Sequence, residues 1–299
     1  MYNQIAANKR KTWVLIIAMT AVILGLSWLF GVVNNVDPAS TVIIGTMFST
    51  VYALISYYAS ASIALASSGA RQIQKSDAPE LWNLVENLCI ANGQPMPKVY
   101  IINDASPNAF ATGRDPEHAA IAFTTGLVQI LDRKELEGVA AHELSHIKNY
   151  DIRVMTIVVV LVGAVMLIAD MLLRGGHIFG GRDNKNAGGA AVVLLIVGLV
   201  LAILSPLLAQ LIQLAVSRSR EYLADASAAL LTRYPAGLAS ALQKISATQQ
   251  PLARANHATA HLFISSPFGT TKKRGFWREL FSTHPPAEDR IARLMNMGG

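Results

Sequence analysis

The sequence predicts a mainly helical α+β integral membrane protein, with four transmembrane helices and one soluble domain that contains a small β-sheet. Its composition is the first reason. Of the 299 residues, 52% are hydrophobic and 15% are charged, against roughly 25% charged in an average soluble chain. The second reason is that the hydrophobic residues gather in four long runs, while the polar segments between them carry helical and strand-like patterns.

The first two hydrophobic runs, at about 13–33 and 41–66, contain no charged residue. Each is long enough to cross a bilayer, which takes about 20 apolar residues in a helix. We therefore interpret residues 1–66 as an N-terminal transmembrane hairpin. A cleaved signal peptide is the alternative for the first run, because basic residues at 9–11 precede it. The run is longer than a signal core and lacks a small-x-small cleavage site, which favours a retained anchor.

Two further runs predict a second transmembrane hairpin at 154–216. The third run carries only Asp170 near its far end, and the fourth begins near Ala190 and contains Pro206, which we expect to kink it. The loop between them, 175–189, is rich in Gly and Asn and is expected to be flexible and external.

The remaining segments, 67–153 and 217–299, then lie on the same side of the membrane as the two halves of one domain. Basic residues flank the runs mainly on this side, whereas the turn at 34–40 has none. By the positive-inside tendency, we expect a multi-pass protein of the inner or plasma membrane with both termini and the soluble domain cytoplasmic. The flanking basic residues are Lys9, Arg10, Lys11, Arg71, Lys75, Lys148, Arg153, Arg218 and Arg220, and the external loop departs from the tendency with Arg174, Arg182 and Lys185.

The net charge of +6 does not indicate a nucleic-acid partner, because the basic residues flank apolar runs and form no patch interleaved with aromatics. The lone Cys89 excludes an internal disulfide and fits a reducing compartment.

Local patterns predict the elements of the soluble domain. Apolar positions at helical spacing predict an amphipathic helix over Pro79 to Asn92. Asp132 followed three residues later by Glu135 is a capping box, which predicts the start of a long helix. Three β-rich runs between these helices predict strands at 98–102, 109–112 and 119–124.

The long helix carries the pattern His142-Glu143-Leu-Ser-His146. Residues four apart lie on the same face of a helix, so one cation can bind both imidazoles. Neutral imidazoles on adjacent turns suit Zn²⁺, and a glutamate next to the first ligand can act as general base. We therefore predict one zinc ion per chain, with His142 and His146 as ligands and Glu143 as the catalytic base. Two histidines that merely pack on a helix face are the structural alternative.

A catalytic zinc site needs a third protein ligand and an open position. Glu221 is our candidate, because the second predicted hairpin would return the chain beside His142 at this point. Asp225 lies one helical turn later and is predicted to orient a ligand histidine through its free ring N–H. An ordinary solvated Glu-Asp pair is the alternative.

These residues resemble the HtpX-type heat-shock membrane metalloproteases over nearly the whole chain. The similar segments are Met1 to Trp13, the His142 motif, Glu221 to Asp225, and Ser282 to Arg290. The resemblance implies a gluzincin-like zinc protease domain, with the ligands and base named above. It also implies a role in quality control of misfolded or damaged membrane proteins, so the expected partners are protein or peptide substrates and the lipid bilayer.

The resemblance implies roles for three more residues. Asn108 begins a segment similar to the edge strand with which gluzincins hold a substrate backbone, and a free strand edge can accept another strand. His284 is implied as a donor to the oxyanion of the reaction, and Arg290 as a lock on the local fold. We expect His118, His177, His257 and His261 not to be ligands.

Three alternatives are weighed against a surface-bound zinc endopeptidase. An intramembrane zinc protease would need apolar flanks, but Lys134, Glu137, Lys148 and Arg153 flank the motif. A prenyl-protein endopeptidase would need a larger membrane chamber than four spans provide. A four-span scaffold or transporter with a structural or vestigial metal site would need charges within the spans, and only Asp170 qualifies.

Overall fold

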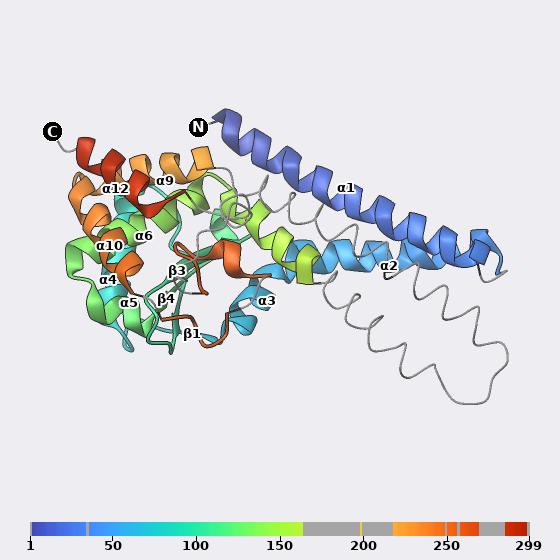
Figure 1. The fold of residues 1–299 in the computed structure, drawn as a ribbon, viewed down its shortest axis with the longest axis horizontal. Helices are drawn as coiled ribbons and strands as arrows, with labels where there is room; N and C mark the ends of the chain where they lie inside the picture. The colour runs from blue at the N-terminus through green and yellow to red at the C-terminus, as the bar shows by residue number, and fades with distance from the viewer. Residues whose placement is uncertain are drawn as a thin grey trace.

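The structure, a computed structural model, describes residues 2–33, 36–163, 198, 218–248, 250–255, 258–268 and 285–297. A pair of long helices projects from a body in which a small sheet packs against several helices (Figure 1). Most of the second predicted hairpin lies outside the described residues, as do the predicted external loop and His284.

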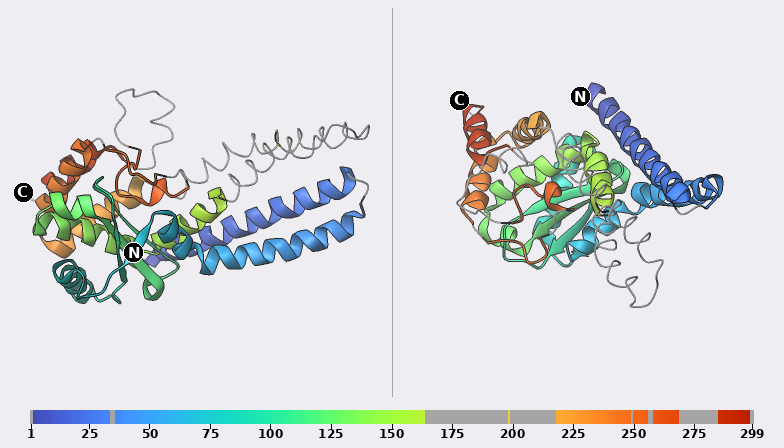
Figure 2. Two further views of the ribbon diagram at one scale, coloured as in Figure 1. Left: turned by 90° about the horizontal axis from the view of Figure 1, so that it is seen from below. Right: turned by 45° about the vertical axis from the view of Figure 1, so that its right-hand side comes forward.

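The projecting pair consists of α1 (Tyr2–Val33) and α2 (Pro38–Tyr58). Asp37 caps α2 by accepting hydrogen bonds from the backbone of Ala39 and Ser40, and Pro38 occupies the first helical position. The two helices run side by side, with α1 starting at the body and α2 returning to it (Figure 2). A Cβ atom at Gly45 would lie 2.2 Å from Ser27 Oγ, so a glycine is needed there for close helix packing.

The predicted span at 41–66 is not one helix. It is interrupted at Ala59, where α2 ends and α3 (Ser60–Ser67) begins. Among the described residues, Pro38–Tyr58 is the one helix that by length and composition could cross a membrane. Many of its apolar side chains are exposed in the isolated chain, including Ile44, Met47 and Phe48. Four spans therefore stay a prediction.

The sheet has four strands in the order β1-β2-β4-β3. The strands are β1 (Ala70–Gln72), β2 (Lys98–Ile102), β3 (Ala109–Gly113) and β4 (Ala119–Thr124). Only β2 and β4 pair in parallel, and the other two pairings are antiparallel. The three predicted strands are confirmed, with β3 one residue longer than expected. The short β1 was not predicted, because three residues with an irregular exposure pattern give no period-two signal.

The helices of the body are α4 (Pro79–Asn92), α5 (Thr125–Ile130), α6 (Arg133–Lys148), α9 (Arg218–Thr232), α10 (Pro235–Ala247) and α12 (Ala287–Asn296). Two short 3-10 turns, η1 (Pro116–His118) and η2 (Ala260–Leu262), accompany them. The predicted bounds of α4 are confirmed, as is the capping box of α6, in which Asp132 and Glu135 bond reciprocally to backbone N–H groups.

Helix α6 lies at the centre of the body. It contacts β3 and β4 on one side and α4, α9 and α10 on the others. Its residues from Val139 to Ile147 are all buried, and they share the main core with Ile121 and Phe123 of β4. A helix buried on nearly all sides is held rigidly by its neighbours, which suits it to carry a site that requires fixed geometry.

After α6 the chain turns sharply and continues as a helix over 151–163. Tyr150 forms the turn with a φ angle of 60°, a left-handed conformation that is strained for a bulky residue. The following helix packs against α1, where Leu15 contacts a cluster that includes Val154, Ile157 and Leu161. The N-terminal hairpin thereby packs against the helix that directly follows α6, the helix with the predicted metal motif.

Candidate metal centre

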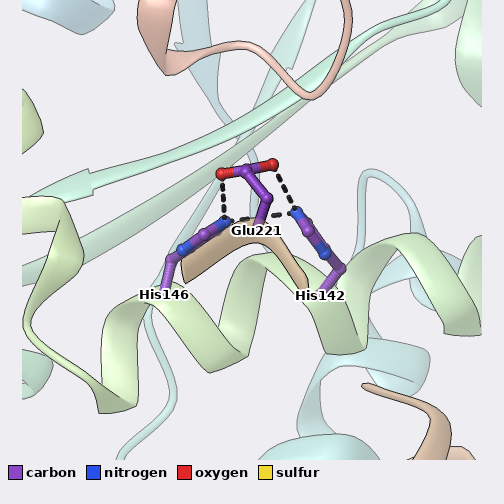
Figure 3. A group of neighbouring side chains, drawn as sticks. All are labelled: His142, His146 and Glu221. Atoms are coloured by element: carbon purple, nitrogen blue, oxygen red, sulfur yellow. Dashed lines mark hydrogen bonds and ion pairs between the residues drawn. The ribbon is translucent and has the colours of Figure 1, made fainter. Parts of the chain in front are cut away.

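The two histidines of α6 face each other one helical turn apart (Figure 3). His142 Nε2 and His146 Nε2 are 3.2 Å from each other. His142 is 1% exposed and His146 is 5% exposed, so neither ring is a solvated surface group. The expected common face is confirmed.

Glu221 reaches the same point from the first turn of α9, which packs along α6. Its Oε2 lies 3.7 Å from His142 Nε2, and its Oε1 lies 3.4 Å from His146 Nε2. One ligand atom from each of the three residues lies within 4.8 Å of the others. For comparison, ligand atoms about 2.0 to 2.1 Å from a tetrahedral zinc are about 3.3 Å apart. The spacing therefore fits a metal ion between the three side chains.

The far nitrogens of both rings lie against carboxylates. His142 Nδ1 is 2.9 Å from Asp225 Oδ1, and His146 Nδ1 is 3.0 Å from Asp151 Oδ2. A carboxylate can only accept, so each neutral ring carries its proton on Nδ1 and a lone pair on Nε2. The two lone pairs then point at one another and at the Glu221 carboxylate. A cation between the two nitrogens and the carboxylate, either a metal ion or a proton on one ring, resolves this arrangement, so the geometry is compatible with a metal site.

The position of Asp225 beside His142 agrees with the prediction, whereas Asp151 was not predicted. Asp151 lies five residues after His146, at the start of the next helix, and it is brought back to the ring by the Tyr150 turn. The sequence did offer a polar side chain here, because Asn149-Tyr150-Asp151 directly follows the motif. The sequence did not show that the Asp151 carboxylate points back at His146, because this depends on the backbone turn at Tyr150.

Arg290 of α12 is fully buried behind the site. Its Nε and Nη2 donate to the two oxygens of Asp225 at 2.9 and 2.7 Å, and its Nη1 is 3.6 Å from Glu221 Oε2. Burial alone would raise the pKa of Asp225, but the charge of Arg290 and the hydrogen bonds lower it well below its usual range. The expected lock on the local fold is therefore a direct neighbour of the metal centre.

Glu143 is 2% exposed and lies on α6 between the two histidines. Burial raises its pKa, although the charges of His142 and His146 act in the opposite direction. For His146, burial lowers the pKa, but the hydrogen bond to Asp151 and the charges of Glu221, Asp151 and Glu143 outweigh it and raise the pKa to about 9. A proton on His146 and a metal ion would therefore compete for the same position.

Comparison with known proteins identifies the family of this arrangement. A model of peptidase family M48 matches residues 75–297, which include every side chain of the candidate metal centre. The chain belongs to peptidase family M48. It is a metalloprotease of the HtpX type, as its curated relatives show.

Three of these relatives are each called a protease HtpX homolog. The protein from Tropheryma whipplei (strain Twist) is 51% identical over 298 residues, covering 100% of this chain and 99% of the relative. The protein from Dictyoglomus thermophilum is 47% identical, with coverage of 99% and 95%. The protein from Streptococcus gordonii is 43% identical, with coverage of 99% and 100%.

A solved structure, that of S. mikatae Ste24p, has a similar fold. It superposes with a TM-score of 0.50 at 20% sequence identity, covering 98% of this chain and 67% of that chain. The likeness supports the expected mainly helical M48 fold with a small mixed sheet.

In this M48 peptidase, Asn108 lies just before the edge strand β3 and is buried. Its Nδ2 donates to Ser265 O at 3.0 Å, and its Oδ1 accepts from Ser265 N at 3.3 Å. Ile264 N also donates to Ala109 O at 3.0 Å. The outer edge of β3 was expected to have free backbone groups. At Ala109 this edge is instead hydrogen-bonded to the segment 264–265 of the same chain.

None of the other five histidines was predicted to be a metal ligand, and the structure describes two of them. His118 pairs with Asp115 at an exposed site, and His261 lies 2.8 Å from Met155 O. Neither belongs to the metal cluster found among the described residues. His177, His257 and His284 lie outside the described residues, so the implied oxyanion role of His284 stays a prediction.

Proposed function

We propose that this M48 peptidase is a membrane-anchored zinc endopeptidase that cleaves misfolded or damaged membrane proteins at the cytoplasmic face. The observation that carries the proposal is the buried cluster of His142, His146 and Glu221 with Glu143 beside it. Two imidazoles and one carboxylate form a ligand set of catalytic zinc sites, which keep a fourth position open.

The proposed reaction is hydrolysis of a peptide bond by water, without a covalent enzyme intermediate. Bound zinc would supply Lewis acidity, polarising the scissile carbonyl and making water more acidic. Glu143 accepts the proton from the attacking water on its carboxylate and passes it to the nitrogen of the leaving amine.

The side chains around the cluster take supporting roles in the proposal. Asp225 holds the ring of His142, and Arg290 holds Asp225. His284 is proposed as the donor that stabilises the developing oxyanion, as the family resemblance implies. We propose one zinc ion per chain, which the one cluster found among the described residues supports.

Substrate is proposed to bind as an extra strand along β3. Asn108 marks the start of this edge, and main-chain hydrogen bonds would give affinity without a strict side-chain requirement. Backbone groups of alternate residues face the same side of a strand, so Ala111 faces outward as Ala109 does. Because Ile264 already donates to Ala109 O, a substrate strand that reaches Ala109 must displace Ile264.

The membrane part of the proposal rests on the hairpin of α1 and α2. Apolar side chains of α2 that are exposed in the isolated chain require an apolar environment. The second hairpin at 154–216 and the four-span topology remain predictions from the sequence. A reporter fused after Gly299 should be cytoplasmic, and one inserted between Gly175 and Gly189 should be external. The reverse pattern would place the site on the other face.

The decisive experiment combines metal content with proteolysis. The full chain, purified in detergent, should contain one zinc per chain and cleave an unfolded protein such as casein. Chelator treatment should abolish cleavage, and stoichiometric zinc should restore it. Cleavage that persists after complete metal removal would refute the zinc mechanism. Zinc binding without cleavage of any unfolded soluble or membrane protein would favour the scaffold alternative.

A further inference from the structure

The N-terminal turns of α1 contact the residues that surround the metal centre. Asn8 is 2% exposed, and its Nδ2 donates to Asp151 Oδ1 at 2.7 Å and to Asn149 O at 3.0 Å. The other oxygen of Asp151, Oδ2, is 3.0 Å from His146 Nδ1. A continuous chain of hydrogen bonds therefore leads from the N-terminal helix to a candidate metal ligand.

The amide of Asn8 also reaches the helix that supplies Glu221. Arg220 Nη1 lies 3.4 Å from Asn8 Oδ1 and 3.3 Å from Asp151 Oδ1. Arg220 directly precedes Glu221 in α9. One side chain of α1 thus bonds to the turn that follows α6 and to the first turn of α9, the two segments next to the candidate ligands.

The two acceptors of the Asn8 amide flank the strained Tyr150. Asn149 and Asp151 stand on either side of the residue with a φ angle of 60°. The ammonium of Lys9 lies 4.6 Å from the centre of the Tyr150 ring. Such a backbone conformation persists only where the surroundings hold it, and α1 supplies part of that support.

We propose that Asn8 is a positioning residue of the metal centre, which holds Asp151 so that Asp151 in turn fixes the ring of His146. The N-terminal helix is then an integral part of the centre as well as an anchor. This inference rests on the proposed zinc function. It predicts that the metal affinity of the chain depends on a residue of α1 that touches neither the metal ligands nor Glu143.

The chemistry requires an amide at position 8. Asp151 is buried, and the strong hydrogen bond from Asn8 Nδ2 helps to hold one of its oxygens, which leaves the other oxygen directed at His146. Asn8→Ala removes the donor. Asn8→Asp keeps the size of the side chain but turns a carboxylate towards Asp151, so the two would repel.

Thr12 provides a matched control. It lies one turn further along the same face of α1 and is fully buried, and its hydroxyl donates to Asn8 O within the helix. Thr12→Val keeps the shape of the side chain and leaves the Asn8 amide in place. Any general effect of changing this buried face should therefore appear in Thr12→Val as well.

The test measures metal binding in the full chain in detergent. Zinc affinity is obtained by competition with a chelator, and the visible spectrum of the Co²⁺-substituted protein reports ligand geometry. Loss of an outer partner of a ligand histidine typically costs 10- to 100-fold in metal affinity. We expect Asn8→Ala and Asn8→Asp to lose zinc affinity by about this factor and to shift the Co²⁺ spectrum, with Thr12→Val close to wild type.

A double-mutant cycle separates positioning from packing. Because Asn8 acts through Asp151, Asn8→Ala should weaken zinc binding little further once Asp151→Asn is present. Additive losses, or wild-type affinity and spectrum in both Asn8 variants, would overturn the proposal. A wild-type chain without stoichiometric zinc would instead refute the proposed function, so the two failures are distinguishable.

Discussion

His142 Nδ1 lies 2.9 Å from Asp225 Oδ1, and both oxygens of Asp225 are held by Arg290 at 2.9 and 2.7 Å. The three residues come from α6, α9 and α12. A carboxylate bound on one side by a guanidinium cannot rotate freely, so it holds the imidazole in a fixed orientation. The orientation of His142, the first candidate ligand of the motif, thus depends on Arg290, a residue near the end of the chain.

We expect Asp225→Ala to weaken zinc retention by about 10- to 100-fold while the fold survives. The variant removes the acceptor for His142 Nδ1 and leaves the charge of Arg290 buried without its main partner. Chelator competition measures the loss, and the far-UV spectrum with the detergent-extracted yield checks that the protein is intact. Wild-type affinity and activity would show that Asp225 only packs between the helices.

Glu143→Gln should keep the metal and lose peptide cleavage, because an amide cannot accept the proton from water. Glu143 is not part of the described metal cluster, so stoichiometric zinc is expected in the variant. General-base catalysis typically contributes 10²- to 10⁴-fold, which sets the smallest expected loss at about a hundredfold. Unaltered turnover in a zinc-loaded variant would show that Glu143 is not the general base.

His142→Ala, His146→Ala and Glu221→Ala should each lose bound zinc. Each change removes one of three ligand atoms and leaves a site with two, which is too few for a stable catalytic zinc. Glu117→Ala is the control, because Glu117 is exposed in η1 and outside the cluster. Zinc content is measured by atomic absorption after dialysis. Full occupancy in Glu221→Ala would point to another third ligand.

Zinc affinity should rise with pH between about 6 and 9. In the metal-free protein the pKa of His146 is raised to about 9, chiefly because the hydrogen bond to Asp151 and nearby carboxylates outweigh burial. Below that pH the ring is protonated, so zinc must displace a proton, and affinity falls up to about tenfold per pH unit. Calorimetry in buffers of different ionisation enthalpy counts the protons released. A release of no proton at pH 7 would contradict this reading.

Much of the domain could be predicted because its signals are local. The capping box at Asp132 and the helical spacing of His142 and His146 each involve residues within a turn or two of one another. The strands at 98–102 and 119–124 were likewise visible as short β-rich runs. The third candidate ligand, Glu221, required an argument about where a hairpin returns the chain, and in the structure Glu221 lies beside the histidines.

The outer contacts of the centre could not be predicted because they join distant parts of the chain. Asn8 meets Asp151 and Arg290 meets Asp225 only after several helices have packed. Asp151 reaches His146 through the positive φ angle of Tyr150, a conformation that few residues other than glycine adopt. The local sequence pattern around each residue does not show which distant residue its side chain will contact.

Gly138 offers a test of how closely α6 is packed. It lies one turn before His142, and a Cβ atom at this position would be 2.8 Å from Leu238 N and 2.9 Å from Leu238 Cα in α10. Both neighbours are backbone atoms, so the helices must move apart to accept a methyl group. Gly138→Ala should therefore destabilise the domain by about 1 to 3 kcal/mol, as overpacking does elsewhere.

The matched control is Gly25→Ala in α1, because a Cβ atom there would meet nothing within 4 Å. Alanine is the better helix former by about 1 kcal/mol, so this change should not lower stability. Thermal unfolding of both variants in the same detergent, with zinc saturating, measures the difference. Since His142 follows Gly138 by one turn, displacement of α6 should also weaken zinc binding. Equal melting temperatures for Gly138→Ala and Gly25→Ala would show that α10 yields without cost, and that the metal helix is less rigidly held than its burial indicates.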